Sequence, residues 1–130
     1  TKDAGASALS VGVGVTNTPN SIASNFGDSI TAWAWYSGTY WHNGPDGAAV
    51  AFTVGDVLQV AVDIPGGKIW FGKNNTWSGD PAAGTGAAFS DLSGEILPVG
   101  SVNSSGIVTY HGAASNQGFA APSGFVPWSS

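Results

Sequence analysis

The stretch "GDVLQVAVDIPGGKIWFGKNNTW", residues 55–77, decides the fold. Its first half alternates, so that successive side chains point to opposite faces, which is the pattern of a β-strand. "PGG" at 65–67 predicts a turn, because proline presets φ and glycine accepts a positive φ. The return half alternates again. We therefore predict a β-hairpin over 55–73, with Asp56 as a turn or capping residue and Asp63 supporting the turn.

The rest of the chain repeats this pattern of short alternating stretches separated by turns. No long window keeps apolar residues at helical spacing, and glycine or proline interrupts throughout. Further strands are predicted over 9–15, 30–36, 95–102 and 106–112. Residues 76–94 are rich in small side chains and predict an ordered surface loop. Recurrent strands joined by turns are typical of a sandwich or barrel.

The composition excludes several classes of partner. Charged residues make up 8% of the 130 residues, the net charge is −5, and arginine is absent. Nucleic acid and anionic membranes require clustered cations, so neither is expected as a partner. No apolar run approaches the ~20 residues of a membrane helix, so no membrane insertion is expected. With no cysteine, disulfides and thiolate metal sites are excluded.

The ionisable residues do not form a recognisable catalytic pattern. Glycoside hydrolysis needs two carboxyl groups across a cleft, and the chain has a single glutamate, Glu95. No G-x-S-x-G motif is present, and His42 and His111 stand apart, as an exposed loop residue and a strand end respectively. A calcium site using Asp80, Asp91 and loop carbonyls stays open as an alternative. We expect no catalytic residue, no metal site and no cofactor.

The aromatic-rich stretch "AWAWYSGTYWHNG", residues 32–44, is the main candidate for binding. Trp33 and Trp35 share a strand face and are predicted to fill the core. The side chains around the turn "SGT" can reach solvent, where rings stack on sugars or apolar anchors and amides give directional hydrogen bonds. The alternative for the same residues is packing at the sheet edge. The candidate ligand-binding residues are Tyr36, Tyr40, Trp41, His42 and Asn43, with Trp77 from a second loop.

Several motifs together resemble the SPRY domain, a concanavalin A-like β-sandwich. They are "LSVGVGVTN" (9–17), the hairpin stretch 55–77, "ILPVGSV" (96–102) and the ending "GF…PSGFVPW" (118–128). The glycine-rich stretch "GDPAAGTGAAF" (79–89) is similar to the version found in phage and prophage tail-fibre and other virion proteins. The resemblance implies an all-β fold of two packed antiparallel sheets, of jelly-roll type, and a binding module without catalytic activity.

The resemblance also sets the expectations for function and domain organisation. We expect a single domain over 1–130 that acts in a virion, as a phage tail-fibre or spike domain recognising a host-surface glycan or protein. The alternative is a structural capsid or tail module that docks to other virion proteins. The aromatic first strand of the family is missing before Leu9, which suggests a C-terminal piece of a longer polypeptide whose upstream region forms a homo-oligomer such as a trimer. The open sheet edge would then be filled by that segment or by a partner.

Overall fold

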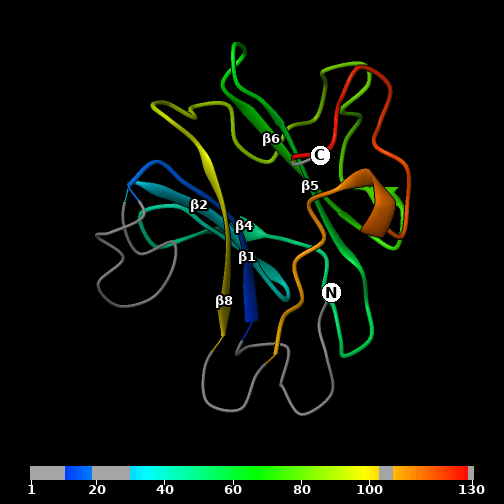
Figure 1. Ribbon diagram of the computed structural model, residues 1–130. Coiled ribbons are helices and arrows are strands. Elements are labelled where there is room, and N and C mark those ends of the chain that lie inside the picture. Colours follow the sequence, from blue (N-terminus) through cyan, green and yellow to red (C-terminus); the bar gives the residue numbers. More distant parts are fainter. Residues whose placement is uncertain (1–10, 19–29, 103–106, 129–130) are drawn as a thin grey trace.

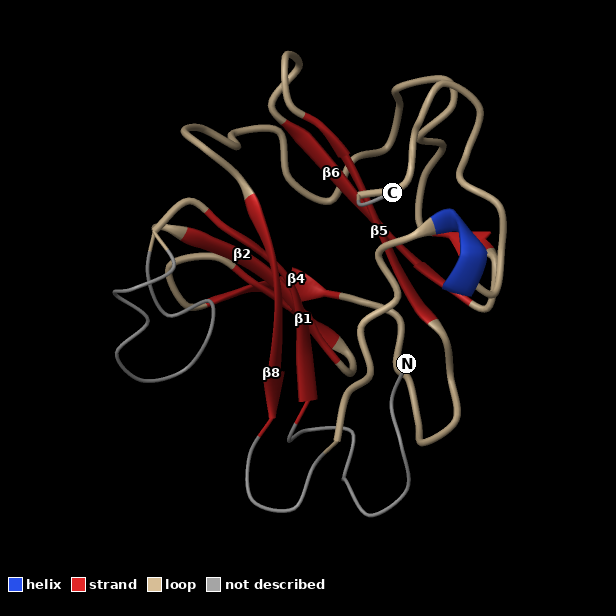
Figure 2. Ribbon diagram, viewed as in Figure 1, coloured by secondary structure: helices blue, strands red, loops and turns tan. Residues whose placement is uncertain are grey.

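The computed structural model describes residues 11–18, 30–102 and 107–128. Within these ranges the protein is all-β, with two antiparallel sheets and one 3-10 helix at Ala114–Asn116. This architecture confirms the predicted two-sheet β-sandwich (Figures 1 and 2). No helix in the described part of the chain is long and apolar enough to span a membrane.

The larger sheet has five strands and the smaller has three. In spatial order the five are β4 (Pro45–Ala48), β3 (Thr39–Trp41), β2 (Ala32–Tyr36), β1 (Val11–Thr16) and β8 (Leu97–Val102). The three are β5 (Leu58–Asp63), β6 (Lys68–Lys73) and β7 (Thr76–Trp77). Strand β1 therefore lies between a neighbour close in sequence and one from the far end of the chain (Figure 1).

The glycines of β1 allow the close pairing of β1 with β2. Val13 and Val15 lie opposite Trp35 and Trp33, so the branched and aromatic side chains share the inner face. Gly14 lies on the other face, where a Cβ would collide with the backbone carbonyl oxygen of Trp33. Only glycine fits there, because every other residue carries that atom.

The hairpin of β5 and β6 confirms the prediction from residues 55–73. Its register is regular from Leu58↔Lys73 to Asp63↔Lys68. The Asp63 carboxylate accepts a hydrogen bond from the Gly66 backbone N–H at 3.1 Å, which supports the turn as predicted. At the other end, the Asp56 carboxylate accepts a hydrogen bond from the Thr53 N–H at 2.7 Å. Both aspartates therefore bind backbone groups that turns leave without strand partners.

The core lies between the sheets. Trp33 and Trp35 come from β2, and Ile69 and Phe71 come from β6; all four are at most 1% exposed. The rings of Trp35 and Phe71 meet across the interface with centroids 5.7 Å apart. The predicted core role of the two tryptophans is confirmed. Burial of such large side chains, at roughly 1.5–3 kcal/mol each, is what holds the two sheets together.

The segment after β7 adds backbone pairing to the second edge of β6. The N–H groups of Ser78, Ala88 and Leu92 donate to the carbonyls of Phe71, Ile69 and Gly67 at 2.8–3.0 Å. The buried indole of Trp70 donates to the Thr85 carbonyl at 2.8 Å. The predicted loop over 76–94 is therefore ordered by the hairpin that it follows, and its first two residues form β7.

Two expectations of secondary structure were wrong. Tyr40 and Trp41 were grouped with loop candidates beside the "SGT" turn, but both lie in β3, which pairs with β4 in an irregular register. A strand was expected over 106–112, but residues 107–112 hold only an isolated bridge position at Val108. Ile107 and Tyr110 stay exposed, so this segment buries no continuous apolar face for a ladder to hold. Residues 106, 9 and 10 lie outside the described ranges.

Candidate functional site

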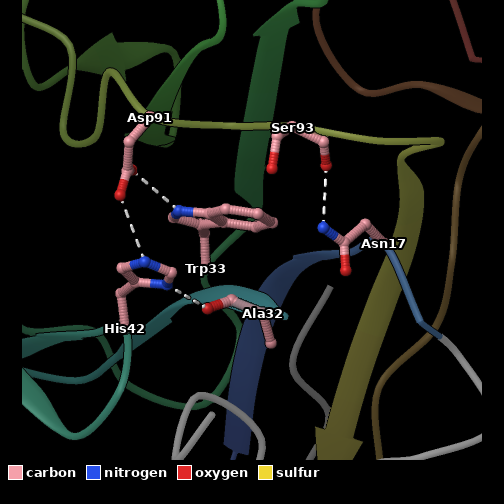
Figure 3. Close-up of polar contacts among 6 residues, drawn as sticks. All are labelled: Asn17, Ala32, Trp33, His42, Asp91 and Ser93. Carbon is pink, nitrogen blue, oxygen red and sulfur yellow. Dashed lines mark hydrogen bonds and ion pairs between the residues drawn. The ribbon is translucent and has the colours of Figure 1, made fainter. Parts of the chain in front are cut away.

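A polar cluster joins Asp91, in the segment after β7, to Trp33 of β2 and to His42, which follows β3 (Figure 3). One oxygen of Asp91 accepts a hydrogen bond from the indole N–H of Trp33 at 2.9 Å, and the other lies 3.2 Å from Nε2 of His42. Nδ1 of His42 lies 2.8 Å from the Ala32 carbonyl oxygen. The His42 ring also stacks on Trp33, with centroids 4.8 Å apart and planes 11° apart.

His42 is therefore not the exposed loop residue expected, since its side chain is 16% exposed. The carbonyl of Ala32 can only accept a hydrogen bond, so its contact with Nδ1 requires a proton on that nitrogen, and Nε2 faces the Asp91 carboxylate. A general base or a metal ligand needs a ring nitrogen that faces its target, whereas both nitrogens of His42 face oxygen atoms of the protein.

A second polar contact holds the same crossing segment. The side-chain amide of Asn17, at the end of β1, donates to the Ser93 carbonyl at 2.8 Å (Figure 3). The Asn17 backbone N–H donates to the Thr31 carbonyl at 2.9 Å, which fixes the asparagine relative to β2. Asp91 and Ser93 are thus both attached to the larger sheet, so the cluster joins the two halves of the sandwich.

Tyr36 and Trp41 form a ring pair on the outer face of the larger sheet. Their centroids are 5.7 Å apart and their planes meet at 65°, an edge-to-face arrangement. The pair packs against the small side chains of Ala32 and Ala34, and the tyrosine ring lies over Gly12, where a Cβ would meet it. Both rings are half-buried, so each has one part against the sheet and another part open to solvent. We call these two residues the ring pair.

The other predicted candidates do not lie with the ring pair. Tyr40 precedes Trp41 in β3 and therefore points to the opposite face, where it packs against Phe71 with centroids 5.6 Å apart. Asn43 is exposed at the turn after β3, with φ of 57°. The ring of Trp77 lies over Gly72, on the outer face of the hairpin. Only Tyr36 and Trp41, with Asn43 near them in sequence, are brought to one surface.

The carboxylates proposed for calcium are engaged elsewhere. Asp91 binds Trp33 and His42, and Asp80 accepts a hydrogen bond from the Ala83 N–H at 3.0 Å. Among the described residues, no group of three or more His, Cys, Asp or Glu side chains is placed to hold a metal ion. Asp91 was missed as the partner of His42 because the two lie in separate predicted loops and no local pattern links them.

One carboxyl group has a shifted pKa. The pKa of Asp56 lies below its ordinary value of 3.8, chiefly because the Thr53 backbone N–H donates to the carboxylate. The side-chain amide of Asn74 also donates to it at 2.8 Å, and Lys73 adds a favourable charge. These contacts lie at the end of the hairpin opposite the turn, and they occupy both oxygens of the Asp56 carboxylate.

The comparisons with known proteins agree with this architecture. A family model for the SPRY domain matches residues 2–113, which is most of the chain. Among curated proteins, no match to the chain was found. The matched region includes both sheets of the sandwich, the ring pair and the His42–Asp91 contact. The chain therefore belongs to the SPRY domain family.

Proposed function

We propose that the protein is a non-catalytic binding module and that the ring pair, Tyr36 and Trp41, is its contact surface. The observation that carries the proposal is that the ring pair is half-buried, edge-to-face, and packed on alanine and glycine residues of the larger sheet. Rings fixed in this way lose little freedom when they bind, and they present flat apolar surface suited to a sugar face or an apolar anchor. Asn43, two residues after Trp41 in the sequence, is exposed and carries an amide that can form hydrogen bonds.

Binding is favoured over catalysis by the state of the ionisable groups. His42 has both ring nitrogens against acceptors, and Asp91 has both oxygens in contacts. Asp56, Asp63 and Asp80 bind backbone N–H groups. Groups committed in this way are poor acids, bases or nucleophiles, because a catalytic group must face the reacting atom.

The setting that we propose is a virion, as part of a phage tail fibre or spike, with a host-surface glycan or protein as the ligand. Support comes from the resemblance of residues 79–89 to the version in phage proteins. It also comes from a composition with 8% charged residues, which suits recognition through hydroxyls, amides and rings rather than through ion pairs.

The test is binding of the purified domain to intact bacterial cells and to an array of bacterial surface polysaccharides. Trp41→Ala and Tyr36→Ala should each weaken binding by up to about tenfold, the effect of losing one stacked ring. Val54→Ala is the control, because Val54 is 44% exposed and lies outside both the ring pair and the lining of the cavity beside β5. Circular dichroism checks that each variant is folded. Binding that survives both ring substitutions contradicts the assigned surface, and no binding by the parent domain contradicts receptor recognition.

The alternative function is a structural module that docks to other virion proteins. One observation favours it independently of the ring pair: an apolar cavity lies beside β5. A domain that completes its sheet with a neighbouring chain would be anchored by that contact.

A further inference from the structure

Within the described part of the chain, β8 is an edge strand of the larger sheet and β5 is an edge strand of the smaller one. Among the described strands, β5 pairs only with β6, and β8 pairs only with β1. Burial differs between the two strands of the hairpin. Ile69, Trp70 and Phe71 of β6 are fully buried, whereas all of β5 except Ala61 is half-buried. The two strands are paired over their whole length, so the difference arises from the side of β5 that faces away from β6.

A cavity of about 730 Å³ extends along that open side of β5. Its lining includes every residue from Val57 to Val62. Successive residues of a strand point to opposite faces of the sheet. Because residues from both faces of β5 line the same cavity, the cavity must lie beside the edge of the strand. The other walls are parts of β1 and β8 and the C-terminal segment, drawn from orange to red beside β5 in Figure 1, which contributes residues between 108 and 128.

The cavity is largely apolar, although Gln59, His111 and Gln117 are also among its lining residues. None of its lining residues is Asp, Glu, Lys or Arg. Of the nine large apolar residues that are exposed in the described ranges, four line it: Ile64, Tyr110, Val126 and Trp128. Exposed apolar residues gathered at one opening mark an interaction surface, whereas single ones scattered over a protein do not.

The geometry points to a docking site for an extended segment of a partner polypeptide, which pairs with the free edge of β5. Strand β5, Leu58–Asp63, is about 20 Å long, and the backbone groups of its alternate residues point away from β6. Only an extended backbone satisfies such a row. Alternate apolar side chains of the added strand would enter the cavity between β5 and the C-terminal segment. The segment is uncharged, because a charge would find no Asp, Glu, Lys or Arg partner in this lining and would lose its hydration.

A second copy of the chain fits the surface less well. Each copy carries a net charge of −5, so two copies repel one another at low ionic strength. A small apolar molecule would fill volume but would leave the backbone groups of β5 unpaired. This inference does not depend on the ring pair, because Tyr36, Trp41 and Asn43 do not line the cavity.

The test is selection of binders from a displayed library of random short peptides, with the whole chain as the target. The selected peptides should be free of charge over a stretch of alternating apolar residues. Hydrogen exchange of the complex should slow at alternate amides within Leu58–Asp63, because every second N–H of an edge strand points outward. Amides of β6 should keep their rates.

A pair of variants distinguishes binding at this site from non-specific hydrophobic binding. Val126→Asp places a charge at the cavity mouth, where the parent side chain is 86% exposed, and should weaken the peptide at least tenfold. Ile30→Asp is the control, since Ile30 is 66% exposed and lies outside the lining. Trp41→Ala should leave peptide binding unchanged, so the two proposals fail separately.

Several outcomes would overturn the inference. They are the absence of any selected peptide, selection of charged peptides, and binding that leaves β5 exchange unchanged. The last such outcome concerns the chain without peptide. If sedimentation shows concentration-dependent dimers and hydrogen exchange shows protected β5 amides, the edge of β5 binds a second copy of the chain instead.

Discussion

Removing the Asp91 carboxylate should destabilise the protein mainly through Trp33 rather than through His42. The indole N–H of Trp33 donates to Asp91 at 2.9 Å, and Trp33 is 1% exposed, so without Asp91 the N–H is buried and unpaired. A hydrogen bond to a charged group contributes about 1.5–3 kcal/mol. The Asp91 side chain is 61% exposed, so its ion pair with His42 contributes only about 0–1 kcal/mol. We expect Asp91→Ala to cost about 2–3 kcal/mol.

Asp91→Asn separates the two contributions. The amide oxygen of asparagine still accepts from the Trp33 indole, and its NH₂ group can donate to Nε2 of a neutral His42 ring that keeps its proton on Nδ1. The expected loss is therefore below about 1 kcal/mol. Urea unfolding followed by tryptophan fluorescence measures both variants, and a loss of about 2 kcal/mol moves the midpoint by roughly 1 M.

A double-mutant cycle with Trp33→Phe completes the test. Phenylalanine keeps an aromatic ring at this position but has no N–H to satisfy. In that background Asp91→Ala should cost less than about 1 kcal/mol, because no donor is left unpaired. The reasoning is refuted if Asp91→Asn costs as much as Asp91→Ala, or if Asp91→Ala costs the same with and without the indole N–H.

Two further predictions concern β1 and the end of the hairpin. Gly14→Ala should cost about 1–3 kcal/mol or more, because its Cβ would collide with the Trp33 carbonyl oxygen. Gly118→Ala, where a Cβ meets nothing, should stay within about 0.5 kcal/mol in the same urea assay, and equal losses would contradict the packing argument. The pKa of Asp56 is lowered by the Thr53 N–H, so its stabilising effect is present above pH 3.8 and is lost as pH falls through the lowered value. Asp56→Asn should therefore flatten the acid limb of stability against pH, and a limb that stays as steep as in the parent would count against this role.

The sequence was most informative where neighbouring residues decide the structure. Alternation and the Pro-Gly-Gly turn predicted the hairpin of β5 and β6, including the roles of Asp56 and Asp63. The spacing of Trp33 and Trp35 placed both in the core. Each of these features depends on a period of two or on a turn residue, which are local properties of the chain.

The candidate site was less predictable because distant contacts decide it. Tyr40 and Trp41 were grouped as loop aromatics, yet a strand at β3 turns them to opposite faces. His42 is half-buried and contacts Asp91, a partner from a segment that no local pattern connects to it. The cavity beside β5 is formed by the C-terminal segment and both sheets, so no single stretch of sequence indicates it.

The position of β1 has a consequence for how the chain assembles during synthesis. Residues 58–77 complete the smaller sheet from neighbours in sequence, so this unit can form as soon as it leaves the ribosome. The ladder that joins Val11 to Val102 must instead wait for nearly the whole chain and close a long loop. The first described strand is thus among the last to be fully paired, and until then its glycine-lined edge is open to any nascent neighbour.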